Sequence, residues 1–262
     1  MKRILSIVII ICFSFSLKAQ QDAAELAKKL ANPISSLISV PFQNNTDYGI
    51  GEWQGTRNTM NIQPVVPIKL NQKLNLITRL IMPITTQYNI TGQSEKQSGL
   101  SDFVLSGFFG PAQAKNNFTW AVGPVFLLPA GTNKYLTTKK FGIGPTAVAL
   151  KQSKGLTFGF LFNQIWSVAG DDDRPPVNQL FLQPFFAHNW KSGAGVGFNF
   201  EYTQNWEAST SVVFLNPIIN GVTAIGKQKI QLAVGPRINI IAPSEMRSDW
   251  GWRAVLVFLF PT

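Results

Sequence analysis

The chain has 262 residues, of which 45% are hydrophobic and 14% charged, with a formal net charge of +10, one cysteine and one histidine. The lone Cys12 excludes a disulfide framework, and with His188 as the only histidine no dedicated transition-metal centre is expected. Basic residues are scattered singly rather than in runs. This pattern argues against a nucleic-acid partner and fits contact with anionic lipid headgroups.

Residues 1–20 have the three parts of a secretory signal peptide. Lys2 and Arg3 precede the apolar run ILSIVIIICFSFSL, and KAQ supplies a small residue where cleavage would occur. Cleavage after Ala19 and after Gln20 both fit the pattern. An uncleaved anchor is the alternative, but the run is short for a transmembrane helix, which needs about 20 apolar residues. The sequence therefore predicts export.

A short helix is predicted over residues 21–33, QDAAELAKKLANP, where Asp22 can cap the start and Pro33 ends the segment. Its apolar face consists of Ala23, Leu26, Ala27 and Leu30. We expect this helix in the periplasm, where it either leads into the next domain or covers its mouth.

From residue 34 to residue 262 the pattern changes to strict alternation. In segment 195–206, for example, one face carries Val196, Phe198, Phe200, Tyr202 and Trp206. Alternation alone also fits a soluble sandwich with one solvated face. Two features favour a membrane: the apolar faces run for about ten residues, the length of a tilted membrane strand, and the opposite faces are small and polar, as in a lumen.

No second long apolar segment follows Gln20, so a membrane-spanning fold must be a closed barrel, in which every backbone hydrogen bond is satisfied. Six tryptophans end the apolar faces and are predicted to form interfacial girdles. These are Trp120, Trp166, Trp190, Trp206, Trp250 and Trp252.

Twelve strands are predicted, an even number as single-chain bacterial barrels require. Their ranges are 34–42, 58–69, 73–83, 99–110, 116–128, 141–151, 155–166, 178–190, 194–206, 209–223, 228–241 and 249–260. Long polar connectors alternate with short ones, except near Glu207. We therefore predict an all-β fold, an antiparallel transmembrane β-barrel of twelve strands in the outer membrane, over residues 34–262.

The closing segment DWGWRAVLVFLFPT, from Asp249 to Thr262, alternates large aromatic and smaller residues. We expect it to pair with the first strand around SSLISVPF, so that no edge remains. Its aromatic end also suggests the barrel assembly machinery as a partner.

Glycine or glutamine precedes proline inside several predicted strands, where proline removes a ladder donor. These sites are Gln63-Pro64, Gly110-Pro111, Gly123-Pro124, Gly144-Pro145, Gln183-Pro184 and Gly235-Pro236. By parity each proline faces lipid, and we expect a bulge or kink there.

Few charged residues are predicted to line the lumen. They are Lys69, Arg79, Asp102, Glu201, Arg237 and Arg253. Arg237 and Arg253 fall on strands that should be adjacent. They would either favour anionic solutes at a constriction or pair with Glu201 or Asp102 and fill the interior. Both interpretations remain open at this stage.

Two further candidates are weak. Asp171, Asp172 and Asp173 form a carboxylate cluster on an outer loop, which would suit Ca²⁺ or Mg²⁺, but a solvated loop is the favoured interpretation. His188 would serve a lipid hydrolase only with an activated serine, and no triad spacing surrounds it, so a structural interfacial histidine is favoured. We expect neither an enzyme nor a cofactor.

The chain resembles the bacterial outer-membrane barrels known as the "transporter" family, also catalogued as "neuromedin U" and related to the phenol meta-pathway degradation barrels. The matching stretches are NPISSLISVPFQNNTDYGIG (32–51), WAVGPVFLLPAGT (120–132), FGIGPTAVAL (141–150), NQIWSVAGDDDRPPVNQLFLQPF (163–185) and AIGKQKIQLAVGPR (224–237). The resemblance implies an outer-membrane barrel with a transport role for hydrophobic or aromatic molecules, and it supplies no catalytic residues.

The expected function is a channel or transporter for small molecules. The alternatives are a non-transporting structural or surface-binding barrel in contact with lipopolysaccharide and, third, a lipid-modifying enzyme. A polar lumen favours more hydrophilic solutes than the resemblance does, and this conflict stays open.

Overall fold

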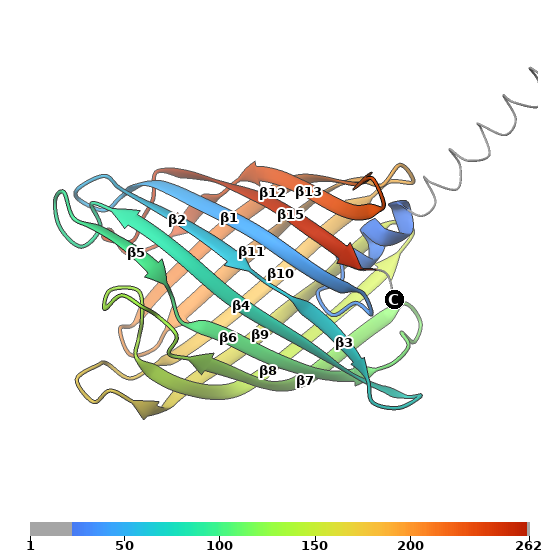
Figure 1. The fold of residues 1–262 in the computed structure, drawn as a ribbon, viewed down its shortest axis with the longest axis horizontal. Helices are drawn as coiled ribbons and strands as arrows, with labels where there is room; N and C mark the ends of the chain where they lie inside the picture. The colour runs from blue at the N-terminus through green and yellow to red at the C-terminus, as the bar shows by residue number, and fades with distance from the viewer. Residues whose placement is uncertain (1–22, 261–262) are drawn as a thin grey trace, which may run out of the picture.

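The wall of the molecule consists of fifteen β-segments, which the computed structural model arranges as one closed antiparallel barrel (Figure 1). The structure describes residues 23–260, so the predicted signal peptide lies outside the described residues. The segments are β1 (Ile38–Ile50), β2 (Gly55–Ile62), β3 (Val65–Lys69), β4 (Leu74–Tyr88), β5 (Lys96–Leu100), β6 (Phe103–Pro111), β7 (Phe118–Leu128), β8 (Lys140–Ser153), β9 (Leu156–Gly170), β10 (Asn178–Asn189), β11 (Ala194–Asn205), β12 (Thr210–Ile225), β13 (Gln228–Pro236), β14 (Ile238–Ile241) and β15 (Trp250–Phe260).

In three places two consecutive segments pair with one and the same neighbouring strand, one after the other along its length. Both β2 and β3 pair with β4, as do β5 and β6 on its other side, and both β13 and β14 pair with β12. Each pair counts as one interrupted strand, so the barrel has the twelve strands that the sequence predicts. The last strand closes the ring on the first in a continuous register from Ile38 opposite Phe260 to Tyr48 opposite Trp250. The predicted closing pair is therefore confirmed, and neither strand is left as an open edge.

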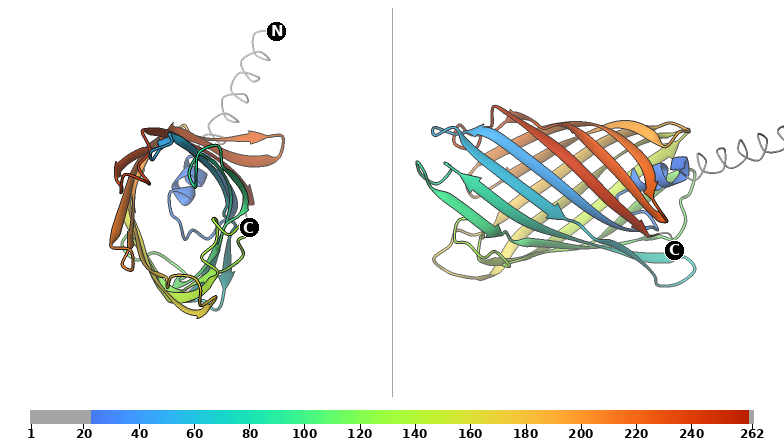
Figure 2. Two further views of the ribbon diagram at one scale, coloured as in Figure 1. Left: turned by 90° about the vertical axis from the view of Figure 1, so that its left-hand side faces the viewer. Right: turned by 45° about the horizontal axis from the view of Figure 1, so that its top comes forward.

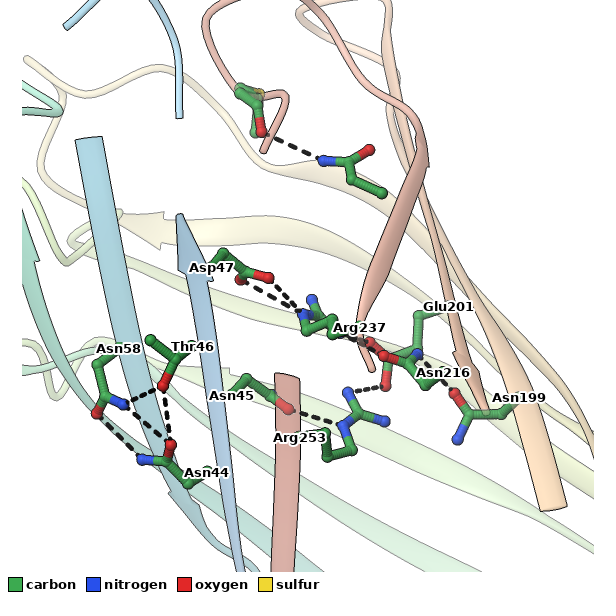
Figure 3. A network of polar contacts seen from close by, with 12 residues as sticks. Asn44, Asn45, Thr46, Asp47, Asn58, Asn199, Glu201, Asn216, Arg237 and Arg253 are labelled. Carbon is green, nitrogen blue, oxygen red and sulfur yellow. Dashed lines mark hydrogen bonds and ion pairs between the residues drawn. The ribbon is translucent and has the colours of Figure 1, made fainter. Parts of the chain in front are cut away.

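The two ends of the barrel differ in their connections. At one end, here the short-turn end, tight turns join β3 to β4, β8 to β9, β10 to β11 and β12 to β13, and at the other, the long-loop end, longer loops predominate. The predicted strands 34–42 and 58–69 leave a long connector over residues 43–57, and this prediction is wrong, because β1 continues to Ile50 and only residues 51–54 turn. On the outer side of β1 and β2, Asn44, Thr46 and Asn58 are joined by hydrogen bonds (Figure 3). Polar side chains on both faces conceal the alternation, although the backbone ladder continues.

Apolar side chains cover the outer face of the wall. On β9, Phe158 and Phe160 are 50% and 43% exposed, whereas Thr157 before them and Leu161 after them are 1% and 2% exposed. Since successive side chains point to opposite faces of a strand, the exposed aromatic row lies outside the barrel. A continuous apolar exterior of this kind suits an apolar surrounding rather than water.

The inner face is less polar than the sequence suggested, and this expectation is corrected. Several inward positions on β7, β8, β9 and β15 carry large buried aliphatic residues, namely Val125, Leu127, Val148, Leu150, Leu161, Ile165, Val257 and Leu259. Val125, Leu127 and Ile165 form a separate cluster with Val104 and Val177. For the other five residues the physical reason lies in the chain that precedes β1. Its helix and the residues after it sit within the short-turn end of the barrel (Figure 2) and need apolar partners there.

The helix spans residues 23–30, inside the predicted range of 21–33. Leu26 and Leu30 pack against the inward residues of β15, and Ile34 joins a buried cluster with Ile77, Phe108 and Leu161. Polar contacts fix the helix from other sides of the wall. The Asn189 side-chain amide donates to the Ala27 carbonyl oxygen at 3.3 Å. No helix within residues 23–260 is long and apolar enough to cross a membrane.

The glycine-proline pairs interrupt the ladder. Between β8 and β9, the register passes from Ile143 opposite Trp166 directly to Thr146 opposite Asn163. At the gap, Pro145 has no N–H to donate, and a Cβ added to Gly144 would lie 1.7 Å from the Gln164 carbonyl oxygen. The same close approach occurs at Gly123 and Gly235. Glycine admits the neighbouring carbonyl where proline has broken the pairing, so the two residues act together.

This packing predicts that Gly144→Ala destabilises the barrel. The added methyl group has no space beside the Gln164 carbonyl, so the backbone must shift, at a cost of about 1–3 kcal/mol in the free energy of unfolding. Gly221→Ala in β12 is the matched control, because nothing lies within 4 Å of its Cβ position. Urea unfolding of the refolded proteins, followed by heat-modifiable gel migration, measures both. Equal midpoints for the two variants would contradict the explanation.

Candidate functional site

A cavity of about 400 Å³ lies in the lumen beyond the buried apolar cluster. Its polar side comes from β1, β2 and β4, with Asn45, Asp47, Arg57, Thr59, Asn61 and Arg79. Its other side, here the apolar side, comes from β6, β9, β10 and β12 and carries Val104, Leu161, Ile165, Phe181 and Phe214, with the polar Ser106, Asn163, Gln179 and Gln183 interspersed among them. Because β9 and β10 lie across the ring from β1 and β2, this mixed lining faces the polar side over the cavity.

A cluster of ion pairs borders the cavity (Figure 3). Arg237 Nε lies 3.1 Å from Asp47 Oδ1, and Arg237 Nη1 lies 2.7 Å from Glu201 Oε2. Arg253 Nη2 lies 2.7 Å from the other carboxylate oxygen, Glu201 Oε1. Glu201 therefore joins two arginines, and the cluster connects strands that are separated by up to two hundred residues of sequence.

Amide side chains complete the hydrogen bonds of the cluster. Asn45 Oδ1 accepts from Arg253 Nε at 2.7 Å, and Asn216 Oδ1 accepts from Arg237 Nη1 at 3.1 Å. The Arg237 guanidinium also lies over the Phe214 ring, 3.5 Å from its centroid, in a cation–π contact. Arg237 is 9% and Arg253 2% exposed, and charges buried this far require such partners.

Of the two interpretations of Arg237 and Arg253, the contacts support internal pairing with Glu201. The alternative partner, Asp102, is wrong: its carboxylate accepts hydrogen bonds from the Thr138 backbone N–H at 2.7 Å and from the Thr137 hydroxyl. It stands between β5 and β6 near the long-loop end, where it holds the loop before β8. Lys69 is exposed at the short-turn end and takes no part in the cluster.

Two arginines on the polar side have amide partners only. Arg57 Nε donates to Gln87 Oε1 at 3.0 Å, and Arg79 Nη2 donates to Gln63 Oε1 at 2.6 Å. Within residues 23–260, neither guanidinium lies within 4.0 Å of a carboxylate oxygen.

Arg79 was among the predicted lumen residues, whereas Arg57 was missed because the predicted strand began at residue 58. The parity that places Thr59 and Asn61 inward would have placed Arg57 inward too.

The acidic loop does not form a metal site in the part of the chain that the structure describes, where no three His, Cys, Asp or Glu side chains converge. Asp171 is held instead by Lys139, whose Nζ lies 3.0 Å from Asp171 Oδ2. This hydrogen bond, together with one from the Asp173 backbone N–H, holds the pKa of Asp171 below its ordinary value. Asp172 and Asp173 remain on the loop surface.

His188 and the tryptophans lie at the rims. The imidazole packs edge-on against Trp190, with ring centroids 5.3 Å apart. All six tryptophans of the predicted girdles are between 36% and 57% exposed. Trp120 and Trp190 lie near the short-turn end, and Trp166, Trp206, Trp250 and Trp252 lie near the long-loop end.

Comparison with known proteins supports the fold. No family model matches the sequence, and no curated protein is similar to it. Among solved structures, the chain is similar to an outer membrane channel from Pseudomonas putida F1, with a TM-score of 0.66 and 13% identity, over 87% of this chain and 97% of that chain. It also aligns with outer membrane phospholipase A from Escherichia coli, with a TM-score of 0.46 and 10% identity, over 91% and 98%. At these identities the first match shows a common fold, and the second is too distant to carry an argument.

The ion-pair cluster predicts a specific loss of stability for Glu201→Gln. The substitution leaves the charges of two buried arginines without their shared carboxylate, and we expect a loss of about 3 kcal/mol in the free energy of unfolding. Glu207→Gln, in the exposed turn after β11, is the matched control and should unfold like the wild type. Urea midpoints of the refolded proteins measure the difference. A wild-type midpoint for Glu201→Gln would show that the cluster contributes nothing to stability.

Proposed function

We propose that the protein is an outer-membrane channel or transporter for small molecules. The observation that supports this proposal most directly is the cavity of about 400 Å³, which is lined by charged and amide side chains although the exterior of the wall is apolar. A barrel with a purely structural role has no need for a polar chamber in its interior. The predicted signal peptide supports export, and the tryptophans at both rims support insertion between lipid or lipopolysaccharide headgroups. The closing strand β15 would be the segment that the barrel assembly machinery binds.

Transport through this barrel requires a movement at the short-turn end. There the cluster around Ile34, Phe108 and Leu161 separates the cavity from the helix of residues 23–30. A smaller space of about 250 Å³ lies beside the helix and is lined by Lys28, Asn32 and Gln152 among others. We propose that displacement of the helix joins the two spaces and opens the path.

The second candidate is a non-transporting structural or surface-binding barrel. The observation that favours it is the same helix, whose Ala27 is fully buried and whose two backbone carbonyls accept side-chain hydrogen bonds from the wall. A lipid-modifying enzyme ranks third, because His188 would be its base and packs against Trp190 instead of a hydroxyl group. We propose no catalytic residue and no cofactor.

Conductance in planar bilayers tests the channel proposal. The double substitution Leu26→Asn and Leu30→Asn removes the apolar contacts of the helix with β15, so we expect openings at least about tenfold more frequent than in the wild type. Glu25→Gln is the matched control, because it breaks only the exposed ion pair with Lys29. The absence of both conductance and liposome swelling in every variant would favour the structural barrel.

A further inference from the structure

We propose that the lumenal cavity is a binding site for small organic carboxylates with an apolar body, and that Arg79 receives the carboxylate. This inference rests on the proposed channel function and names the class of solute. It follows from three observations, which are the unbalanced charge of the site, the surroundings of Arg79, and the apolar side that faces it.

The charges at the site do not balance. Four guanidiniums, those of Arg57, Arg79, Arg237 and Arg253, share two carboxylates, Asp47 and Glu201, which leaves two positive charges in excess. Both oxygens of Glu201 are engaged, one by each of its two arginines. Both oxygens of Asp47 lie within 3.4 Å of Arg237 Nε. A chamber with excess positive charge and low-dielectric walls attracts an anion.

Arg79 is the better placed of the two arginines that lack a carboxylate. It faces the lumen between Ile77 and Ile81 on β4, and the register places it opposite Ser106 on β6. It therefore stands at the border between the polar chamber and the buried apolar cluster. One hydrogen bond, to Gln63, involves Nη2, although a guanidinium carries five N–H donors in a planar fork. The remaining donors suit the two oxygens of a carboxylate.

The apolar side of the cavity selects the rest of the ligand. Leu161, Ile165 and Phe181 line it together with Val104, which pairs with Ile81 beside Arg79. A ligand whose carboxylate meets Arg79 can lay an aromatic or short aliphatic body against these residues and release water from them. The volume of about 400 Å³ falls in the range of small-molecule sites, about 300–1,000 Å³. A neutral solute would leave Arg79 without a carboxylate partner, and a carboxylate without an apolar body would leave the apolar side in contact with water.

Equilibrium titration of the refolded full-length protein in detergent tests the chemical class with three probes. Benzoate carries both features, benzamide has the same shape without the charge, and acetate has the charge without the ring. We expect benzoate to bind at least about tenfold more tightly than either. Equal affinity for benzoate and benzamide would overturn the anion site, and equal affinity for benzoate and acetate would overturn the role of the apolar side. These comparisons use the wild-type protein and do not depend on the folding of a variant.

Two variants then locate the carboxylate. Arg79→Gln should weaken benzoate binding about tenfold or more, because it removes the charged fork beside the apolar side. Arg57→Gln removes an equal charge from the same cavity but leaves the group that receives the carboxylate, so it should weaken benzoate binding clearly less than Arg79→Gln does, by about threefold or less. An equal loss of affinity in both variants would overturn the assignment to Arg79, because it would show that benzoate responds only to the total positive charge of the cavity. Heat-modifiable migration confirms that each variant has folded.

The binding-site proposal and the channel proposal can be refuted independently of each other. Conductance without preference for benzoate over benzamide would leave the channel intact and refute the site. Preferential benzoate binding without conductance in any variant would support the site and refute transport.

Discussion

The structure depends on one constraint: a wall with an apolar exterior must satisfy its own backbone hydrogen bonds, because its surroundings offer none. Pairing of β1 with β15 along eleven residue pairs meets this constraint by removing the last edge. Once the ring is closed, every strand presents one face outward and one inward. Apart from outward groups that bond to each other, such as Asn44, Thr46 and Asn58, the buried polar and charged side chains of the wall then face inward, so the ion-pair cluster forms in the lumen.

Closure also explains why the lumen is divided. The chain before β1 enters the barrel at the short-turn end, where the inward positions of β15 supply apolar contacts to the helix and those of β8 to Ile34 after it. Toward the long-loop end, where the helix does not reach, the same strands carry Arg253 and small residues. Arg237 reaches its position directly after Gly235-Pro236, where the ladder of β13 with β12 stops and β14 begins. An interruption of the wall therefore places the arginine that binds both Asp47 and Glu201.

Much of this fold could be predicted from the sequence, because alternation is a local property. Twelve strands, their order and the closing pair follow from it, and Arg237, Arg253 and Glu201 could be assigned to the lumen by parity. Other features depend on contacts distant in the chain. Leu150 and Leu161 alternate like lumen residues, yet nothing near them in sequence shows that a helix more than a hundred residues earlier packs inside. The exclusion of Asp102 from the cluster depends on its height in the barrel, which parity does not encode.

The arrangement of the lumen also removes the conflict between an apolar and a polar solute. Polar and apolar inward residues are mixed along the sequence, so the sequence alone favours neither a polar nor an apolar solute. The ring arranges them in space, because β2 and β4 carry Arg57 and Arg79, while β9 and β10 across the ring carry Leu161, Ile165 and Phe181 among amide side chains. A cavity with arginines on one side and these apolar residues on the other favours a molecule that has both a charged part and an apolar part. The apolar cluster beneath strengthens this preference, because it keeps water from one side of Arg79 and so raises the gain from an anionic partner.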